Sequence, residues 1–144
     1  MSSVNVIDAS AILAYLQGEK GEEVVEAALG AGECRVTTVN YCEVVSKLCE
    51  KGMPAAEAIR SFDDLGSALV DVDRELAGRA AELRVRTMGI GASLGDRVCL
   101  ALAEREAEEG DVIVYTAEHS WKKLKWPFKV VVIRAGRAAS NKSS

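Results

Sequence analysis

Three carboxylates stand where candidate strands end or candidate helices begin, and a fourth lies deeper in a helix, a placement that suggests chemistry at one edge of a sheet. Asp8 ends the β-branched run Val-Asn-Val-Ile, and Glu118 follows a later apolar run after two intervening residues. Asp96 lies in the first turn of a candidate helix, and Glu43 lies about one turn into another. Helices that follow parallel strands begin at the same edge of the sheet, so the fold would gather Asp8, Asp96 and Glu118. Glu43 could project over the same crevice.

A carboxylate cluster without a neighbouring lysine indicates a divalent metal site, because Mg²⁺ and Mn²⁺ prefer oxygen ligands. Each acid also has a structural explanation that stays open. Asp8 could simply cap the next helix, and Ser93-Leu94-Gly95-Asp96 matches a capping box. Glu118 could complement a helix dipole, and Glu43 could be a solvated side chain. The joint position of the four acids favours the metal-site hypothesis.

The apolar pattern predicts strands that alternate with helices along nearly the whole chain. We expect strands at 4–7, 34–37, 68–72, 112–115 and 130–133, and helices at 9–16, 19–29, 39–51, 55–65, 74–88 and 93–109. Thr38 is expected to cap the helix at 39–51. Residues 89–91 read as a loop, and a short basic helix should follow Glu118.

This alternation predicts an α/β fold, a single-domain α/β/α sandwich around a central, mostly parallel five-stranded sheet. Residues 1–134 would form the domain. Residues 135–144 lack a core pattern and are expected to be a disordered tail.

Composition limits the possible function classes. The chain has 144 residues, 49% hydrophobic and 28% charged, without an apolar run near the ~20 residues that span a bilayer. The N-terminus has no signal-peptide pattern, so we expect a cytoplasmic protein without membrane partners. A net charge of −4 argues against binding nucleic acid by bulk charge but allows a nuclease with an acidic metal site.

The cysteines and the histidine give little indication of a zinc site. The four cysteines, at 34, 42, 49 and 99, form no Cys-x-x-Cys pair, and His119 is the only histidine. We expect the thiols to be buried and reduced, and His119 to lie on the surface.

Four motifs carry a resemblance to a known family. They read Val-Ile-Asp-Ala-Ser-Ala (6–11), Thr-Val-Asn-Tyr-Cys-Glu-Val (38–44), Ser-Leu-Gly-Asp-Arg-Val-Cys-Leu-Ala (93–101) and Val-Tyr-Thr-Ala-Glu (114–118). Together they resemble the PIN-domain ribonucleases, closest to the VapC-like toxins of VapBC type II toxin–antitoxin systems. The last acid of that family is usually Asp, whereas this chain has Glu118.

The resemblance implies a metal-dependent endoribonuclease that cleaves RNA phosphodiester bonds with Mg²⁺ or Mn²⁺. Its catalytic acids would be Asp8, Glu43, Asp96 and Glu118, with Asp8 and Asp96 as direct metal ligands. Glu118 would reach further than Asp or act through a bridging water. Ser10 and Thr116 would be supporting polar residues.

The same resemblance implies a homodimer and a small cognate antitoxin. Helices at 19–29 and 55–65 are candidates for the antitoxin groove.

Possible RNA contacts come from the stretch Trp121-Lys122-Lys123-Leu124-Lys125-Trp126, which interleaves cations with aromatic rings. Alternatively, the tryptophans anchor a short helix and Lys122, Lys123 and Lys125 are solvated. Arg97 could contact a phosphate or pair with a carboxylate.

Rival functions are weaker. A haloacid-dehalogenase-type phosphatase needs a second Asp where this chain has Ser10, and a response-regulator receiver needs a lysine where it has Arg134. The serious alternative is a catalytically weak PIN domain that binds RNA or a partner without cutting, and the glutamate at position 118 is its support.

Overall fold

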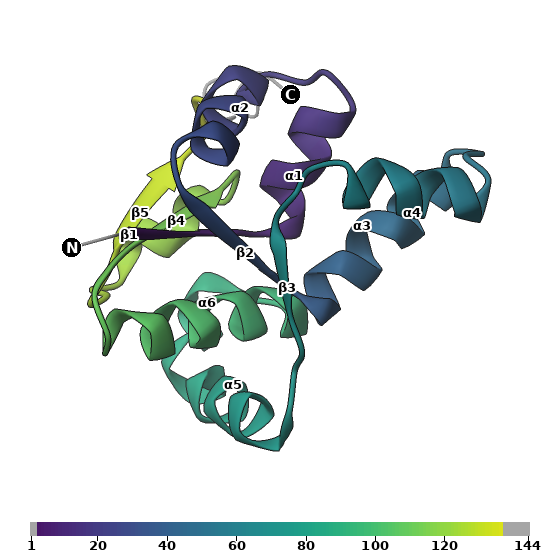
Figure 1. Cartoon of the computed structure of the whole chain (residues 1–144). Helices are drawn as coiled ribbons and strands as arrows, with labels where there is room; N and C mark the ends of the chain where they lie inside the picture. The colour runs from purple at the N-terminus through teal and green to yellow at the C-terminus, as the bar shows by residue number, and fades with distance from the viewer. Residues whose placement is uncertain (1–2, 137–144) are drawn as a thin grey trace, which may run out of the picture.

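The computed structural model describes residues 3–136 of the chain, which form strands and helices in alternation (Figure 1). The strands are β1 (Ser3–Ile7), β2 (Glu33–Thr37), β3 (Ala68–Val70), β4 (Asp111–Thr116) and β5 (Lys129–Val132). The α-helices are α1 (Ala9–Leu16), α2 (Glu22–Gly30), α3 (Thr38–Glu50), α4 (Ala55–Asp63), α5 (Arg74–Arg86) and α6 (Leu94–Ala107). Two short 3₁₀ helices are η1 (Met88–Ile90) and η2 (His119–Lys123).

The five strands form one sheet in the order β3-β2-β1-β4-β5, and every pairing is parallel. The carboxyl ends of all the strands therefore lie at one edge. Ile7 at the end of β1 pairs with Tyr115 on β4, which places Asp8 beside Thr116. This sheet confirms the predicted α/β fold with its central parallel sheet.

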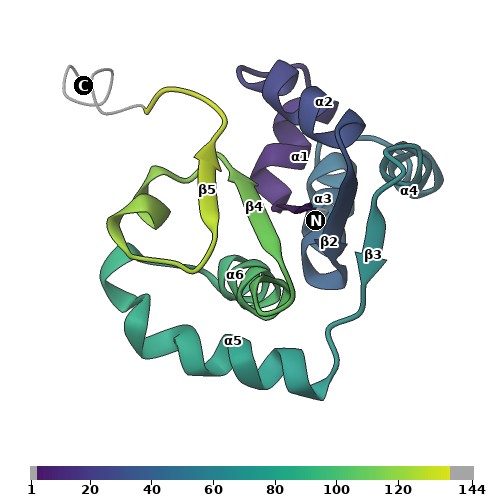
Figure 2. The ribbon, with the colours of Figure 1, turned by 60° about the vertical axis from the view of Figure 1, so that its left-hand side comes forward.

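Helices cover both faces of the sheet, with α5 and α6 on one side and α1 to α4 on the other (Figure 2). Successive side chains of β1 point to opposite faces of the sheet, so they belong to two different parts of the hydrophobic core. Val6 packs with residues of α5 and α6, whereas Ile7 packs with residues of α1, α2, α3 and α4. Both side chains are fully buried. Helices thus pack against both faces of the sheet, and the strand ends at its carboxyl edge are fixed by this packed core.

The N-cap of α3 differs from the prediction by one residue. Thr37, not Thr38, has the extended backbone of a cap, and its hydroxyl oxygen accepts from the Asn40 amide at 3.0 Å. Thr38 begins the helix, and its hydroxyl oxygen accepts from the Val72 amide at 3.1 Å. Both residues are good N-caps by type, so tertiary contacts decided between them.

The start of α2 also differs, because the helix begins at Glu22 and not at residue 19. Gly21 has a φ of 97°, in the left-handed region, which no helix continues through. A Cβ at this position would lie 2.7 Å from the Ile133 carbonyl oxygen. The chain therefore turns at Gly21, and the preceding Glu19 pairs with Arg134 at 3.3 Å.

Several smaller predictions have mixed outcomes. Residues 88–90 form a 3₁₀ turn in place of the expected loop. The four cysteines are free thiols, but only Cys34 and Cys99 are buried, so the prediction was wrong for the exposed Cys42 and the half-buried Cys49. His119 is exposed, as expected. No helix within residues 3–136 is long and apolar enough to cross a membrane.

The domain assignment stays a prediction. Residues 137–144 of the expected tail lie outside the described part of the chain.

Candidate acidic site at the carboxyl edge of the sheet

Asp8 lies at the carboxyl end of β1 and is the N-cap of α1. The residue is only 3% exposed. Its Oδ1 accepts hydrogen bonds from the Ser10 hydroxyl at 2.7 Å and from the Ala11 amide at 2.9 Å. Its Oδ2 accepts from the Thr116 hydroxyl at 2.6 Å. Parallel pairing of β1 with β4 brings Thr116 to this carboxylate across 108 positions of sequence.

Burial raises the pKa of Asp8 from its ordinary value of 3.8 to about 7. The hydrogen bonds from Thr116, Ala11 and Ser10 favour the charged carboxylate and lower this pKa, but they do not offset the lost hydration. The negative charge of Asp96 adds a smaller increase. Asp8 is therefore a desolvated acid whose charged form a nearby cation would stabilise.

Asp96 forms the capping box of α6. Its amide donates to the Ser93 hydroxyl oxygen at 3.2 Å, and its Oδ2 accepts from the Ser93 amide at 3.0 Å. Within residues 3–136, the other carboxylate oxygen, Oδ1, accepts no hydrogen bond. Asp96 is half-buried. The capping role therefore uses one oxygen of Asp96 and leaves the second open to another partner.

Glu43 lies on α3, half-buried, with its carboxylate against the first turn of α6, so it is more than a solvated surface side chain. Asn40 Nδ2 donates to Glu43 Oε1 at 2.8 Å and to the Gly95 carbonyl at 3.3 Å. Asn40 is 1% exposed, and its Oδ1 accepts from the Thr37 hydroxyl at 3.0 Å. A buried amide thus links the cap of α3, the Glu43 carboxylate and the start of α6.

Cys99 shows that three of the acids converge. Burial raises the pKa of this thiol well above its ordinary value, and the negative charges of Asp8, Asp96 and Glu43 raise it further. The contacts agree, because Asn40 joins the Glu43 carboxylate to the carbonyl of Gly95, the residue before Asp96, and the charge of Asp96 also raises the pKa of Asp8. The structure therefore gathers Asp8, Glu43 and Asp96 in one region above α6.

Glu118 approaches the same region through its backbone. Its amide donates at 3.0 Å to the Thr116 hydroxyl oxygen, the same hydroxyl that contacts Asp8. Its side chain is exposed and makes no capping hydrogen bond at the start of η2. In the described part of the chain, no hydrogen bond joins this side chain to Asp8, Glu43 or Asp96. Glu118 thus lies at the rim of the acidic region.

The donor set fits a hard divalent cation in its chemistry. None of the four acids forms an ion pair with a lysine or arginine within residues 3–136. Over the same residues, no three His, Cys, Asp or Glu side chains are spaced as a complete metal site. Mg²⁺ retains several waters and binds through one or two carboxylates, so two ligands such as Asp8 and Asp96 are enough for it.

Comparison with known families identifies the family of this chain. A family model described as the PIN domain matches residues 6–127. The chain belongs to the PIN domain family. This confirms the resemblance predicted from the motifs around the four acids.

Relatives of this PIN domain include a VapC ribonuclease of Mycobacterium bovis and ribonuclease VapC42 of Mycobacterium tuberculosis. Each is 31% identical over 124 residues, covering 77% of this chain and 94% of the relative. Among solved structures, a VapBC2 complex from Rickettsia felis bound to promoter DNA is similar with a TM-score of 0.64 and 13% identity, covering 89% of this chain and 97% of that chain. A toxin–antitoxin complex from Klebsiella pneumoniae is similar with a TM-score of 0.66 and 15% identity. The match covers 92% of this chain and 99% of that chain. At these identities the structural likeness shows the fold alone.

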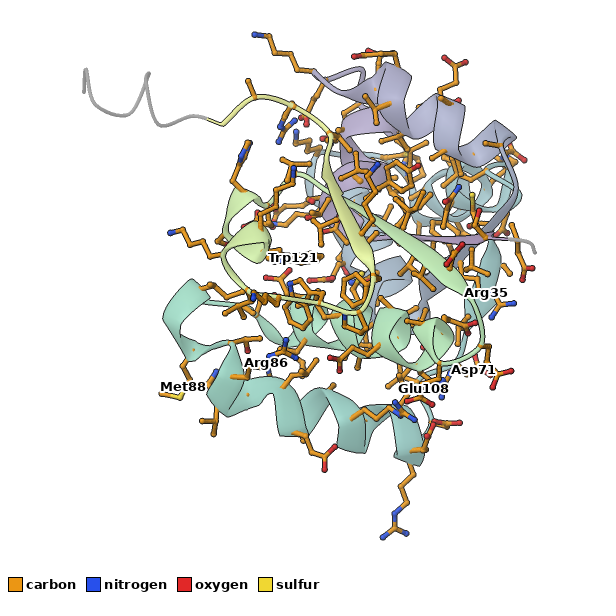
Figure 3. The ribbon with its side chains drawn as sticks, turned by 90° about the vertical axis from the view of Figure 1, so that its left-hand side faces the viewer. Arg35, Asp71, Arg86, Met88, Glu108 and Trp121 are labelled. Carbon is orange, nitrogen blue, oxygen red and sulfur yellow. The ribbon has the colours of Figure 1, made fainter. Side chains whose placement is uncertain are left out.

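The aromatic rings predicted as possible RNA contacts are engaged inside this PIN domain. Trp121 is fully buried and lies under the loop that leads to β5 (Figure 3). The Trp126 indole donates to the Trp121 carbonyl at 2.8 Å, stacks on Phe128 and lies under the Arg86 guanidinium. The predicted stacking strip is therefore wrong for Trp121, which has no free face, whereas the three lysines, at 122, 123 and 125, are exposed.

Arg97 points away from the acids. Its Nη1 donates to the Ala80 carbonyl of α5 at 3.0 Å, and it pairs with no carboxylate in the described part of the chain. Of the two alternatives, the ion pair with a carboxylate is therefore wrong, because the side chain bridges the two helices that cover this face of the sheet. The phosphate contact stays a prediction.

Sequence reasoning missed Asn40 and Gly95. Asn40 stands inside the motif around Glu43, three positions before it, a spacing that puts both on one face of a helix and was the available signal. Gly95 gave no local signal beyond its place in the capping box, because its contact is with another helix.

Proposed function

We propose that this PIN domain is a metal-dependent endoribonuclease, the toxin of a toxin–antitoxin pair, which hydrolyses RNA phosphodiester bonds. The observation that carries the proposal is the buried Asp8 carboxylate, charge-coupled to Asp96 and without a cationic partner in residues 3–136. An uncompensated buried carboxylate is unfavourable unless a bound cation offsets it. The 31% identity to VapC ribonucleases supports the substrate class.

The proposed roles follow from the contacts. Asp8 and Asp96 would hold Mg²⁺ or Mn²⁺ directly. When bound, such an ion lowers the pKa of a coordinated water and polarises the phosphoryl group. Ser10 and Thr116 fix the orientation of the Asp8 carboxylate through their hydroxyl groups.

The two remaining acids, Glu43 and Glu118, would have supporting roles. Glu43, held by Asn40, would orient the attacking water or hold a second metal ion. Glu118 at the rim would act as a longer-reach ligand or through a bridging water.

The proposed partner is a small antitoxin, in a cytoplasmic homodimeric complex. A groove of about 490 Å³ between α1, α2 and α4 includes Leu16, Leu29 and Leu65 in its lining. An amphipathic antitoxin segment could bury these residues. A basic side chain of that segment would reach the acidic edge.

An RNA cleavage assay tests the function. The chain, purified free of any bound inhibitor protein, should cleave single-stranded or structured RNA with Mg²⁺ or Mn²⁺ and lose that activity in excess EDTA. Asp8→Asn should abolish cleavage, whereas Asp73→Asn, an exposed N-cap aspartate of α5, should retain it. Full activity in EDTA would refute the metal requirement. RNA binding without cleavage under any of these ions would favour the non-cutting binding module.

A further inference from the structure

Gly95 lies directly beneath the Glu43 carboxylate. Gly95 is buried at the second position of α6. A Cβ built at this residue would lie 2.6 Å from Glu43 Cδ and 2.5 Å from Oε2, well inside van der Waals contact. Any side chain larger than hydrogen would therefore displace the carboxylate from its present position.

The backbone does not explain a glycine here. Gly95 is absent from the glycines with positive φ, which are Gly18, Gly21, Gly52, Gly66 and Gly91. At a helical φ and ψ, glycine favours the helix less than alanine does. Gly78 in α5 is also helical, yet a Cβ there would meet nothing within 4 Å. The special feature of Gly95 is thus the space that it leaves for Glu43.

We infer that Gly95 is a positioning residue. Because it has no side chain, it leaves room for the Glu43 carboxylate against the start of α6, next to Asp96. This inference rests on the proposed nuclease function and names a residue that the function depends on without contacting substrate. Asn40 holds Glu43 from the α3 side at 2.8 Å and the Gly95 carbonyl at 3.3 Å. Gly95 and the Asn40 amide together determine the position of the Glu43 carboxylate.

A methyl group at position 95 should move Glu43 without unfolding the protein. The atoms that it would meet are the far end of a flexible side chain, and Glu43 is only half-buried, so it can rotate toward solvent. The Asn40 hydrogen bond would be lost in that rotation. A displacement of about an ångström in a catalytic group can slow a reaction on the order of a hundredfold. The effect should therefore appear in catalysis and metal response rather than in stability.

The test compares Gly95→Ala, Glu43→Ala and the double variant with the wild type, with Gly78→Ala as a matched helical glycine control. Three quantities are measured: the single-turnover RNA cleavage rate, the Mn²⁺ concentration for half-maximal cleavage, and Tm with EDTA and with Mn²⁺. Gly95→Ala should slow cleavage on the order of tenfold to a hundredfold. It should also raise the half-maximal Mn²⁺ concentration and leave Tm in EDTA unchanged or higher. Gly78→Ala should match the wild type in cleavage.

The double variant identifies the route of the effect. If Gly95 acts through Glu43, Gly95→Ala should add no further loss of cleavage or of the Mn²⁺-induced Tm rise once Glu43→Ala is present. An equal fold loss in both backgrounds would overturn the inference, because the methyl group would then act elsewhere. Wild-type cleavage and Mn²⁺ dependence in Gly95→Ala would overturn it as well, while leaving the nuclease function intact.

The inference can also be tested if the wild type proves not to cleave RNA. That result would refute the proposed function alone. The contact would then be judged by Tm in EDTA, where Gly95→Ala should raise Tm more in the Glu43→Ala background than in the wild type. Equal changes in Tm in the two backgrounds would show that the methyl group and Glu43 do not interact, and would overturn the inference.

Discussion

Asp8→Asn replaces a buried charge with a neutral amide of nearly the same shape, and its effect on stability can be worked out from the structure. Burial raises the folded-state pKa of Asp8 from 3.8 to about 7. Each pKa unit corresponds to about 1.4 kcal/mol, so the ionised carboxylate lowers the metal-free stability by about 4 kcal/mol at pH 8. The folded state binds this proton more tightly than the unfolded state. The stabilisation is therefore complete below about pH 4 and is lost as the pH rises to about 7.

Asparagine should keep the helix cap while removing this penalty. Its Oδ1 can accept from the Ala11 amide and the Ser10 hydroxyl, and its amide can donate to Thr116, whose hydroxyl oxygen accepts as well as donates. In EDTA at pH 8 we expect Asp8→Asn to gain about 2–4 kcal/mol, or on the order of 10 °C in Tm. At pH 5 the folded wild type is protonated at Asp8 but its unfolded chain is largely ionised, so the gain should shrink to about 1.6 kcal/mol and should vanish only below about pH 4.

The assay is thermal and urea unfolding in EDTA from pH 5 to 8.5, repeated with Mn²⁺. Asp73→Asn is the matched control, because Asp73 also caps a helix, accepting from the Leu76 amide at 2.9 Å, but is exposed. Its stability should follow the wild type across the pH range. With Mn²⁺, the wild type should gain more stability than Asp8→Asn, since the ion would bind only the native state. A loss of stability in Asp8→Asn that is equal at pH 5 and pH 8 would show that Asp8 is a structural cap, and the argument from its burial would fail.

Two further predictions concern the rim of the site. Glu118→Gln should reduce the cleavage rate on the order of tenfold, because its contact with the metal or with a water would be weaker. Glu118→Asp should retain or raise the rate. An unchanged rate in Glu118→Gln would leave position 118 without a catalytic role. Combined replacement of Lys122, Lys123 and Lys125 by alanine should weaken RNA binding and lower the slope of log K against log salt by about 2, if each lysine contacts one phosphate of a single strand. Because all three side chains are exposed, Tm should stay within about 2 °C, and an unchanged salt slope would mean that they are only solvated.

Local patterns predicted the parts of this fold that depend on neighbouring residues in sequence. The alternation of Val6 and Ile7 between two cores follows from the two-residue period of a strand, and the strand ends follow from where that pattern stops. Asp8 could therefore be placed at the sheet edge before the structure was known. The N-cap of α3 could not be settled between Thr37 and Thr38, because the Val72 amide that engages Thr38 comes from a distant loop.

Contacts between elements could not be read from the sequence. Asn40 and Gly95 meet across 55 positions, and only the relative placement of α3 and α6 brings them together. Arg97 adjoins Asp96 in sequence, yet successive residues on a helix point about 100° apart, so its guanidinium reaches Ala80 on α5 instead of the acids. Trp121 illustrates the same limit, because its alternation with lysines predicts an exposed strip as readily as an anchor in the core.

Helix capping and the proposed metal binding would use the same carboxylate of Asp8, but capping alone does not explain why the residue is an aspartate. Asparagine caps a helix about as well as aspartate does. At a position that is 3% exposed it would also avoid the unfavourable burial of a charge, about 4 kcal/mol near neutral pH. A residue selected for stability alone would therefore be neutral here. A carboxylate at this point is favourable only when something positive binds beside it, and the described part of the chain supplies no such group. The proposed metal ion accounts for the charge that the fold by itself does not need.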